Sequence, residues 1–218
     1  VAPPKGQCGQ DGFEEGNAEQ YRWFVPQNIG GLVAAMGGRD KVIPEMDRFF
    51  QQLNVGPNKP YQWCGNEVDF AMPWLYNYVG QPWKTQALVR RIQDKLYAPT
   101  PDGLPGNDDL GAQSSWYVWS ALGLYPVTPG TTDLALHTPL FSDIELHLGN
   151  GNTLRIRAPD ASQAKPYVDA VQADGKLWSR TWLPAAMVDA GGTLDVEVSS
   201  RPNRHWGVNA DAAPPSYP

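Results

Sequence analysis

The most unusual segment of the sequence is the loop Pro101–Asp109, which ends in Asn107, Asp108 and Asp109 just before a predicted helix. Its two glycines and two prolines restrict the backbone to a tight turn. A carboxylate held on such a turn is a suitable general base for activating water. An Asp before a helix also commonly caps the free N–H groups of the first turn. The pattern is compatible with both roles.

A second polar loop runs from Cys64 to Asp69 and contains Asn66 and Glu67. Clustered carboxylate and amide oxygens suit a hard cation such as calcium. The spacing is not that of an EF-hand, and helix capping is the structural alternative. The loop leads into a predicted aromatic helix that contains Trp74.

A third segment, 13–24, carries three glutamates that precede or open a helix rich in aromatic residues. These glutamates are Glu14, Glu15 and Glu19. Most glutamates in such positions are solvated residues of a first helical turn. In a sugar site one of them could act as a general acid, with the neighbouring aromatic rings lining the pocket.

Helices must position these three segments, because apolar residues recur at helical spacing through the first half of the chain. Leu88, Ile92 and Leu96 mark one helix that begins after Pro82. Gly123 stands where a helix C-cap belongs. Further helices are predicted at 17–25, 28–36, 40–53, 68–79 and 110–123.

After Pro126 the period of the apolar residues changes from helical spacing to two. Ile144 and Leu146 alternate with polar residues, and the segment 149–152 is a strong hairpin signal. The pattern predicts an antiparallel sheet with one face exposed to solvent, which would form half of a sandwich. We therefore expect three parts: helices over 1–125, a β region over 126–210, and a linker or tail over 211–218.

The composition describes a globular protein of 218 residues with a formal net charge of -6. It has no basic cluster, which argues against nucleic-acid binding, and no apolar run of 18 residues that could span a membrane. Nine Trp and nine Tyr are many for this length. Core filling is their default explanation, but aromatic rings also stack on sugars, so the excess favours a carbohydrate partner. The three histidines lie far apart and are interpreted as structural; they are His137, His147 and His205.

The two cysteines indicate whether the protein works inside or outside the cell. Cys8 and Cys64 could pair in an exported protein and would stay reduced in the cytosol. The 21 prolines and the low lysine content favour export and a disulfide. The chain starts at Val1 without a Met or a signal peptide, which predicts a processed or cut piece of a longer protein.

Taken together, the motifs resemble glycoside hydrolase family 92, the calcium-dependent exo-acting α-mannosidases. The resemblance covers nearly the whole chain, and its motifs are long and ordered. The segments that carry it are Glu15–Ala18, Gln20–Tyr21, Val25–Pro26, Gly65–Glu67, Trp74–Tyr78, Gly80–Gln86, Asp102–Asp109, Ser115–Val118, Ala121–Val127, Pro202–Asn203 and Trp206–Gly207.

This resemblance implies a mixed α and β fold. Members of the family combine an N-terminal β-sandwich domain with an (α/α)6 helical barrel and a small β region. The chain would hold the later barrel helices in 1–125 and the closing antiparallel sheet in 126–210. A second chain carrying the N-terminal part of the same enzyme would then complete the barrel. A secreted enzyme acting on mannose-containing glycans is the expected context.

The mechanism implied by the resemblance is calcium-dependent hydrolysis of terminal α-mannose with inversion. The family's base corresponds to Asp109, with Asp108 and Asn107 beside it. Calcium in the family contacts the O2/O3 region of the sugar, and Asn66 and Glu67 are candidates for that zone, as ligands or as sugar contacts. The substrate-binding set is completed by Glu15, Asp69 and Trp74.

Two departures from the family pattern bear on the substrate. Many members have the acid glutamate where Gln20 stands here, although Glu15 or Glu19 could serve instead. A His-containing pair often follows Gly-Asn-Glu, whereas 68–71 contains no His. A phosphate leaves as an anion without protonation, so Gln20 would fit cleavage of mannose from Man-α-1-phospho-6-Man. An ordinary exo-α-1,2-mannosidase is the alternative, and a non-catalytic carbohydrate-binding module is the alternative of another class.

Overall fold

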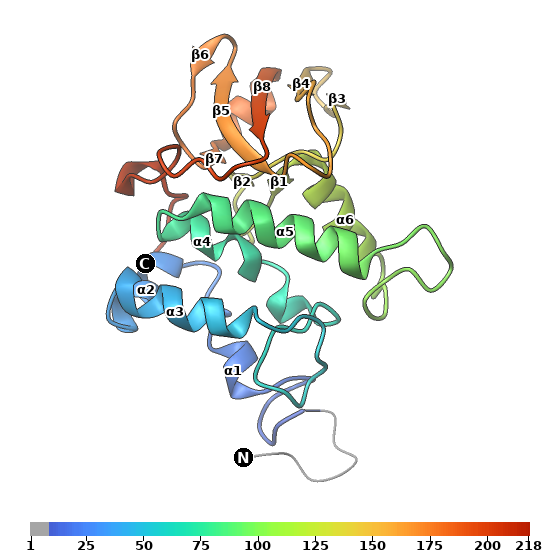
Figure 1. Cartoon of the computed structure of the whole chain (residues 1–218), viewed down its shortest axis with the longest axis vertical. Coiled ribbons are helices and arrows are strands. Elements are labelled where there is room, and N and C mark those ends of the chain that lie inside the picture. The colour runs from blue at the N-terminus through green and yellow to red at the C-terminus, as the bar shows by residue number, and fades with distance from the viewer. Residues whose placement is uncertain (1–8) are drawn as a thin grey trace.

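The structure, a computed structural model, describes residues 9–218 and has a helical half followed by a strand half (Figure 1). The predicted mixed α and β class is confirmed. The helices are α1 Ala18–Tyr21, α2 Ile29–Ala35, α3 Arg39–Phe49, η1 Glu67–Asp69, η2 Met72–Trp74, α4 Leu75–Tyr78, α5 Pro82–Leu96, α6 Ala112–Leu122, α7 Ala185–Ala190 and η3 Ala210–Ala212. The strands are β1 Leu124–Tyr125, β2 Leu134–Leu136, β3 Asp143–His147, β4 Thr153–Arg157, β5 Tyr167–Ala173, β6 Lys176–Leu177, β7 Trp182–Leu183 and β8 Gly192–Ser199.

Two predicted helices of the helical half are confirmed together with the residues that begin and end them. Helix α5 begins at Pro82, where the missing N–H costs nothing, and it buries Leu88 and Ile92 on its inner face. Helix α6 lies between Gly111 and Gly123, which are both left-handed. A Cβ at Gly123 would lie 2.9 Å from the backbone nitrogen of Pro139, so only glycine fits this C-cap.

Two predicted helices are shorter than expected. The segment 17–25 contains only the four residues of α1, and 68–79 divides into η1, η2 and α4. Pro73 lies in η2 and has no N–H to continue an α-helical ladder, which accounts for part of this division. The polar loop before η1 is therefore joined to short turns rather than to one long helix.

The strand half is a sandwich of two sheets, with strand orders β1-β2-β7 and β3-β4-β8-β5-β6. The predicted hairpin is confirmed, because β3 pairs antiparallel with β4 and Ile144 lies opposite Ile156. One apolar core joins the sheets and includes Leu134, Leu183 and Leu194. The prediction of a purely antiparallel sheet is wrong, since β8 runs parallel to β4. The intervening strands and α7 supply the crossover that parallel neighbours need.

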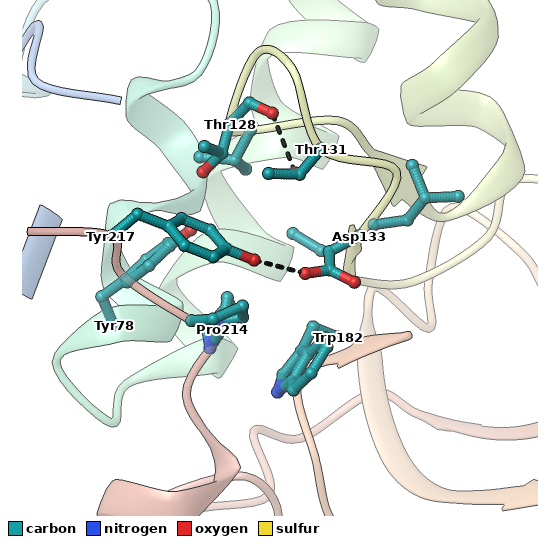
Figure 2. A pocket seen from close by; sticks show the side chains of 11 residues that line it. Tyr78, Thr128, Thr131, Asp133, Trp182, Pro214 and Tyr217 are labelled. Atoms are coloured by element: carbon teal, nitrogen blue, oxygen red, sulfur yellow. Dashed lines mark hydrogen bonds between the residues drawn. The ribbon is translucent and has the colours of Figure 1, made fainter. Parts of the chain in front are cut away.

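The segment 211–218, expected to be a linker or tail, packs against both halves of the molecule. Ala212 is buried, and its carbonyl accepts hydrogen bonds from the N–H and the hydroxyl of Thr181 at 2.8 and 2.9 Å. The hydroxyl of Tyr217 donates to Asp133 at 2.7 Å beside a small cavity (Figure 2). This end of the chain therefore has a fixed place in the fold.

His137 is buried where the helical half meets the sheets, as its structural interpretation predicted. Its Nδ1 accepts a hydrogen bond from the indole N–H of Trp74 at 3.2 Å, and its Nε2 donates to the carbonyl of Ser120 at 2.8 Å. This pattern requires the neutral ring, because a proton on Nδ1 would face the indole N–H. Burial lowers the pKa of His137 to about 3, and the charge of Arg90 adds to this effect.

We expect His137 to make the protein less stable in acid. Below pH 6.5, the ordinary pKa of histidine, His137 is protonated in the unfolded chain but stays neutral in the folded protein. The free energy of unfolding therefore falls as the pH falls toward 3. Between pH 7 and pH 5 this difference amounts to about 2 kcal/mol. In His137→Asn the loss between these two pH values should shrink by that amount in urea unfolding. An unchanged loss would show that other groups cause the acid sensitivity.

Candidate active site

Three polar loops that are far apart in the sequence meet in the helical half. The amide of Asn66 donates to the carbonyl of Glu15 at 2.6 Å, which joins the second and third segments. A Cβ at Gly106 would lie 2.8 Å from the Cα of Gly65, so the loop 101–109 packs directly on the same turn. In Figure 1 the loops that precede η1 and α6 lie away from the five-stranded sheet. The sequence-predicted segments therefore form one region.

The loop 101–109 is held tightly from within and from outside. A Cβ at Gly103 would lie 1.9 Å from the carbonyl oxygen of Ala98, so the backbone itself fills that space. Asn54 donates from its side-chain amide to the carbonyl of Pro105 at 2.9 Å. Nothing in the sequence pattern pointed to Asn54, because its partner lies 51 residues away. The predicted rigid turn is present.

Asp109 lies exposed at the end of this loop in a left-handed conformation, with φ of 45°. Leu110 and Gly111 follow with φ of 58° and 92°, and the helix α6 begins directly afterwards. A non-glycine residue in this region costs about 1–3 kcal/mol, and such strain persists where the surroundings impose it, often at active sites. The carboxylate of Asp109 is thus exposed where the chain turns into α6.

Asp108 has the other role that the sequence left open. Its Oδ1 accepts hydrogen bonds from the backbone N–H and from the hydroxyl of Ser114, both at 2.9 Å. Ser114 lies in the first turn of α6, so Asp108 caps that helix. The structure thus gives the two neighbouring carboxylates different surroundings: Asp108 caps the helix, and Asp109 is exposed and remains the candidate base.

Glu15 is an exposed carboxyl group on the loop that Asn66 contacts. It is also left-handed, with φ of 44°, and its carbonyl is the group that Asn66 holds. Glu67 and Asn107 are exposed, and Asn66 is buried beside Glu15. Glu15 and Asp109 therefore lie on loops that both contact the turn at Gly65 and Asn66.

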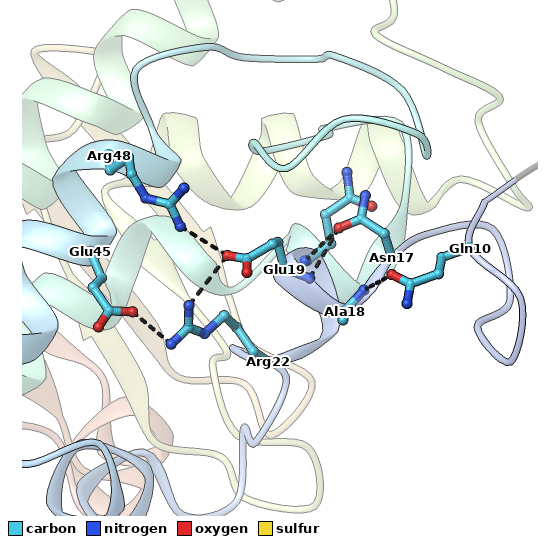
Figure 3. A network of polar contacts seen from close by, with 8 residues as sticks. Gln10, Asn17, Ala18, Glu19, Arg22, Glu45 and Arg48 are labelled. Carbon is cyan, nitrogen blue, oxygen red and sulfur yellow. Dashed lines mark hydrogen bonds and ion pairs between the residues drawn. The ribbon is translucent and has the colours of Figure 1, made fainter. Parts of the chain in front are cut away.

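Gln20 is not in the position that we expected. Its side chain is fully buried, and its amide donates to the carbonyls of Gly56 and Tyr61, each at 3.0 Å. Glu19 is engaged in ion pairs with Arg22 and Arg48 at 3.2 and 3.0 Å (Figure 3). Gln20 therefore anchors the loop beneath α1, and of the candidate acids Glu15 is the exposed one, on the loop that Asn66 contacts.

Asp69 and Trp74 are also interior residues, contrary to the expected sugar contacts. Asp69 is fully buried and accepts a hydrogen bond from the N–H of Trp63 at 2.6 Å. Burial raises the pKa of its carboxyl to about 8. Trp74 stacks on Tyr125 at a centroid distance of 3.9 Å and is fully buried. Both side chains are enclosed by the packing of the helices, which a sequence pattern does not reveal.

The region offers oxygen donors but no complete metal cluster. Within residues 9–218 no group of three His, Cys, Asp or Glu side chains is arranged to hold a metal ion. Asn66 and Glu67 supply amide and carboxylate oxygens, which are donors that calcium prefers. The predicted pairing of Cys8 with Cys64 involves a residue outside the described part; Cys64 itself is buried. In the same part of the chain, no helix is long and apolar enough to cross a bilayer.

Comparison with known proteins agrees with these observations. The sequence model of the glycosyl hydrolase family 92 catalytic domain matches residues 2–200. An uncharacterized secreted glycosidase of Arthroderma benhamiae is 29% identical over 210 residues, which are 95% of this chain and 26% of that protein.

Solved structures give the same result. A family 92 α-mannosidase of Bacteroides thetaiotaomicron, in complex with mannoimidazole, superposes with a TM-score of 0.88 and 30% identity over 98% of this chain and 30% of its own. A family 92 inverting mannosidase of the same organism superposes with a TM-score of 0.86 and 32% identity, over 99% of this chain and 32% of that protein. The chain thus spans about a quarter to a third of the length of these relatives. With the family model matched over nine-tenths of its length, the chain belongs to glycoside hydrolase family 92.

Proposed function

We propose that this chain is part of an inverting exo-α-mannosidase in which Asp109 is the general base. The single observation that carries this proposal is the strained, exposed turn at Asp109, at the end of a loop whose Gly106 packs against Gly65. The similar solved enzymes are described as an α-mannosidase and an inverting mannosidase, which supports the substrate and the stereochemistry.

In this proposal the reaction is a single displacement with two carboxyl groups. Asp109 accepts a proton from a water molecule while that water attacks the anomeric carbon of mannose. Glu15 donates a proton to the glycosidic oxygen, so the leaving sugar departs as a neutral alcohol. The two carboxyl groups lie on different loops, which is compatible with one group on each side of the glycosidic bond.

Calcium is the proposed cofactor. Asn66 and Glu67 are the residues of this chain that would hold it, and they supply only part of the six to eight oxygens that calcium takes. When bound, calcium would orient the O2 and O3 hydroxyls of mannose and favour distortion of the ring. The remaining ligands would come from the substrate, from water or from the rest of the enzyme.

A mannosyl-phosphodiester hydrolase is the second candidate. The absence of His at 68–71 still favours an unusual leaving-group subsite. The buried position of Gln20 removes the other reason, because its amide binds the loop carbonyls at 56 and 61 and does not replace an acid. Since Glu15 offers a carboxyl group at the site, ordinary α-mannosidase activity is better supported.

We further propose that the enzyme is secreted and that the remainder of a family 92 protein completes the site. The relative named a secreted glycosidase supports export. The small share of each relative that this chain covers supports a completing part, either a second chain or more of the same polypeptide. An (α/α)6 barrel would then form from both parts, with mannose-containing glycans as substrates.

The function is tested by assaying the complete enzyme on α-1,2-mannobiose and on Man-α-1-phospho-6-Man, each before and after removal of calcium by a chelator. We expect turnover of the mannobiose, release of β-mannose in the first NMR spectra, loss of activity on chelation, and recovery with Ca²⁺. Calcium should also raise the melting temperature. Exclusive turnover of the phosphodiester would support the second candidate, and binding without any hydrolysis would support a carbohydrate-binding module.

A further inference from the structure

Three consecutive carbonyl groups around Glu15 are each held by a different part of the chain. The carbonyl of Glu14 accepts from the hydroxyl of Tyr21, that of Glu15 from the amide of Asn66, and that of Gly16 from the N–H of Gln10. All three distances are 2.6 Å. The segment 14–16 has no helix or strand of its own, so these bonds determine its path.

The left-handed conformation of Glu15 makes this restraint necessary. A glutamate with φ of 44° is at an energetic disadvantage and relaxes unless its neighbours prevent it. The ring of Tyr21 also closes the space beside Gly16, because a Cβ there would lie 2.8 Å from a ring carbon. The backbone bonds therefore fix the direction in which the exposed Glu15 side chain leaves the loop.

Tyr21 and Asn66 are themselves held firmly. Asn17 caps α1 and donates to the carbonyls of Pro57 and Lys59 at 2.8 and 2.9 Å, which fixes the helix that carries Tyr21. The ion pairs of Glu19 with the arginines join the same helix to α3 (Figure 3). Asn66 is 6% exposed and follows Gly65, against which the loop 101–109 packs. The restraint on Glu15 is thus connected to the loop of Asp109.

We propose that Tyr21 and Asn66 are positioning residues that aim the carboxyl group of Glu15 at the leaving oxygen. This inference rests on the proposed function, in which Glu15 is the acid. Displacement of a reacting group by about 1 Å can cost on the order of 10²-fold in rate. Proton donation matters when the leaving group is a sugar alcohol and matters little when it is a stable anion. Loss of either restraint should therefore reduce activity strongly on substrates whose leaving group must be protonated, and only slightly on substrates whose leaving group is a stable anion.

The test measures kcat/KM of the complete enzyme on α-1,2-mannobiose and on 2,4-dinitrophenyl α-mannoside, whose leaving group needs no proton. Tyr21→Phe should lower the value on mannobiose by about 10- to 100-fold and on the dinitrophenyl substrate by about 3-fold or less. Asn66 is also a proposed calcium ligand, so its replacement would affect both substrates, and Tyr21→Phe is the deciding variant. Tyr76→Phe is the matched control, since it removes a hydroxyl that donates to Asp47 at 2.8 Å elsewhere in the helical half. This control should leave both values unchanged.

Equal losses on the two substrates, or no loss on either, would overturn the positioning role. Circular dichroism and melting curves check that Tyr21→Phe, which removes one oxygen atom only, still folds. Glu15→Gln separates this inference from the proposed function. If that variant shows the leaving-group dependence and Tyr21→Phe does not, only the positioning role fails. If Glu15→Gln does not show it, the assignment of the acid fails first.

Discussion

Replacement of Asp109 by Asn is expected to lower kcat on α-mannosides by about 10²–10⁴-fold, the usual contribution of a general base. Asn has the same shape and tolerates the left-handed region, so the strained turn at φ of 45° should persist. It cannot accept the proton of the attacking water. The measurement is kcat of the complete enzyme on α-1,2-mannobiose, with the melting temperature as a check on the fold.

Asp108→Asn is the matched control for this experiment. The change is chemically identical and lies one residue away, but Asp108 accepts its hydrogen bonds from Ser114 at the start of α6. Asn is also a good helix cap, so this variant should lose less than about 1 kcal/mol of stability and keep most of its activity. If Asp108→Asn is the inactive variant and Asp109→Asn is active, the assignment of the base is reversed. If both variants bind and neither wild type nor variant hydrolyses, the chain belongs to a binding module.

Replacement of Glu15 by Gln is expected to produce a loss that depends on the leaving group. On α-1,2-mannobiose kcat/KM should fall by about 10²–10⁴-fold, because the departing alkoxide has no proton donor. On 2,4-dinitrophenyl α-mannoside the loss should be about tenfold or less, because that anion is stable in water. The ratio of the two losses is the measurement, and it is independent of the enzyme concentration.

Glu14→Gln is the control for Glu15, since both side chains are exposed and adjacent in the loop. The backbone carbonyl of Glu14, which Tyr21 holds, is unaffected by this change. Activity of the control should stay near that of the wild type. A similar loss in both variants would argue for a general effect of charge in the loop, and a uniform loss on both substrates in Glu15→Gln would remove Glu15 from the role of acid.

Elements whose formation depends on residues close together in the chain could be predicted from the sequence. Helix α5 and the β3–β4 hairpin were recognised because spacing, Pro82 and the turn at 149–152 are local signals. The parallel pairing of β8 with β4 was missed because the two strands are separated by about 35 residues of other elements. A sheet's register across such a distance is decided by packing and crossover geometry.

The same limit applies to the candidate site. The loops and their carboxylates were predicted, but the pattern could not distinguish Asp108 from Asp109, because the distinction rests on three left-handed residues in succession. Only Gly111 signals such a turn in the sequence. The burial of Gln20 and Trp74 was missed for a related reason, since their partners, Gly56 and Tyr125, come from distant parts of the chain.

The bond between Asn66 and Glu15 spans 51 residues, and so does the bond between Asn54 and Pro105. Such contacts close large loops, and the entropy of closing them is recovered only when the remaining structure has formed. We therefore expect the carboxylates to reach their places late in folding, after the local helices and hairpin exist. In reverse, mild denaturation separates these loops before it unfolds the core. We consequently expect the candidate site to be lost under milder conditions than the fold.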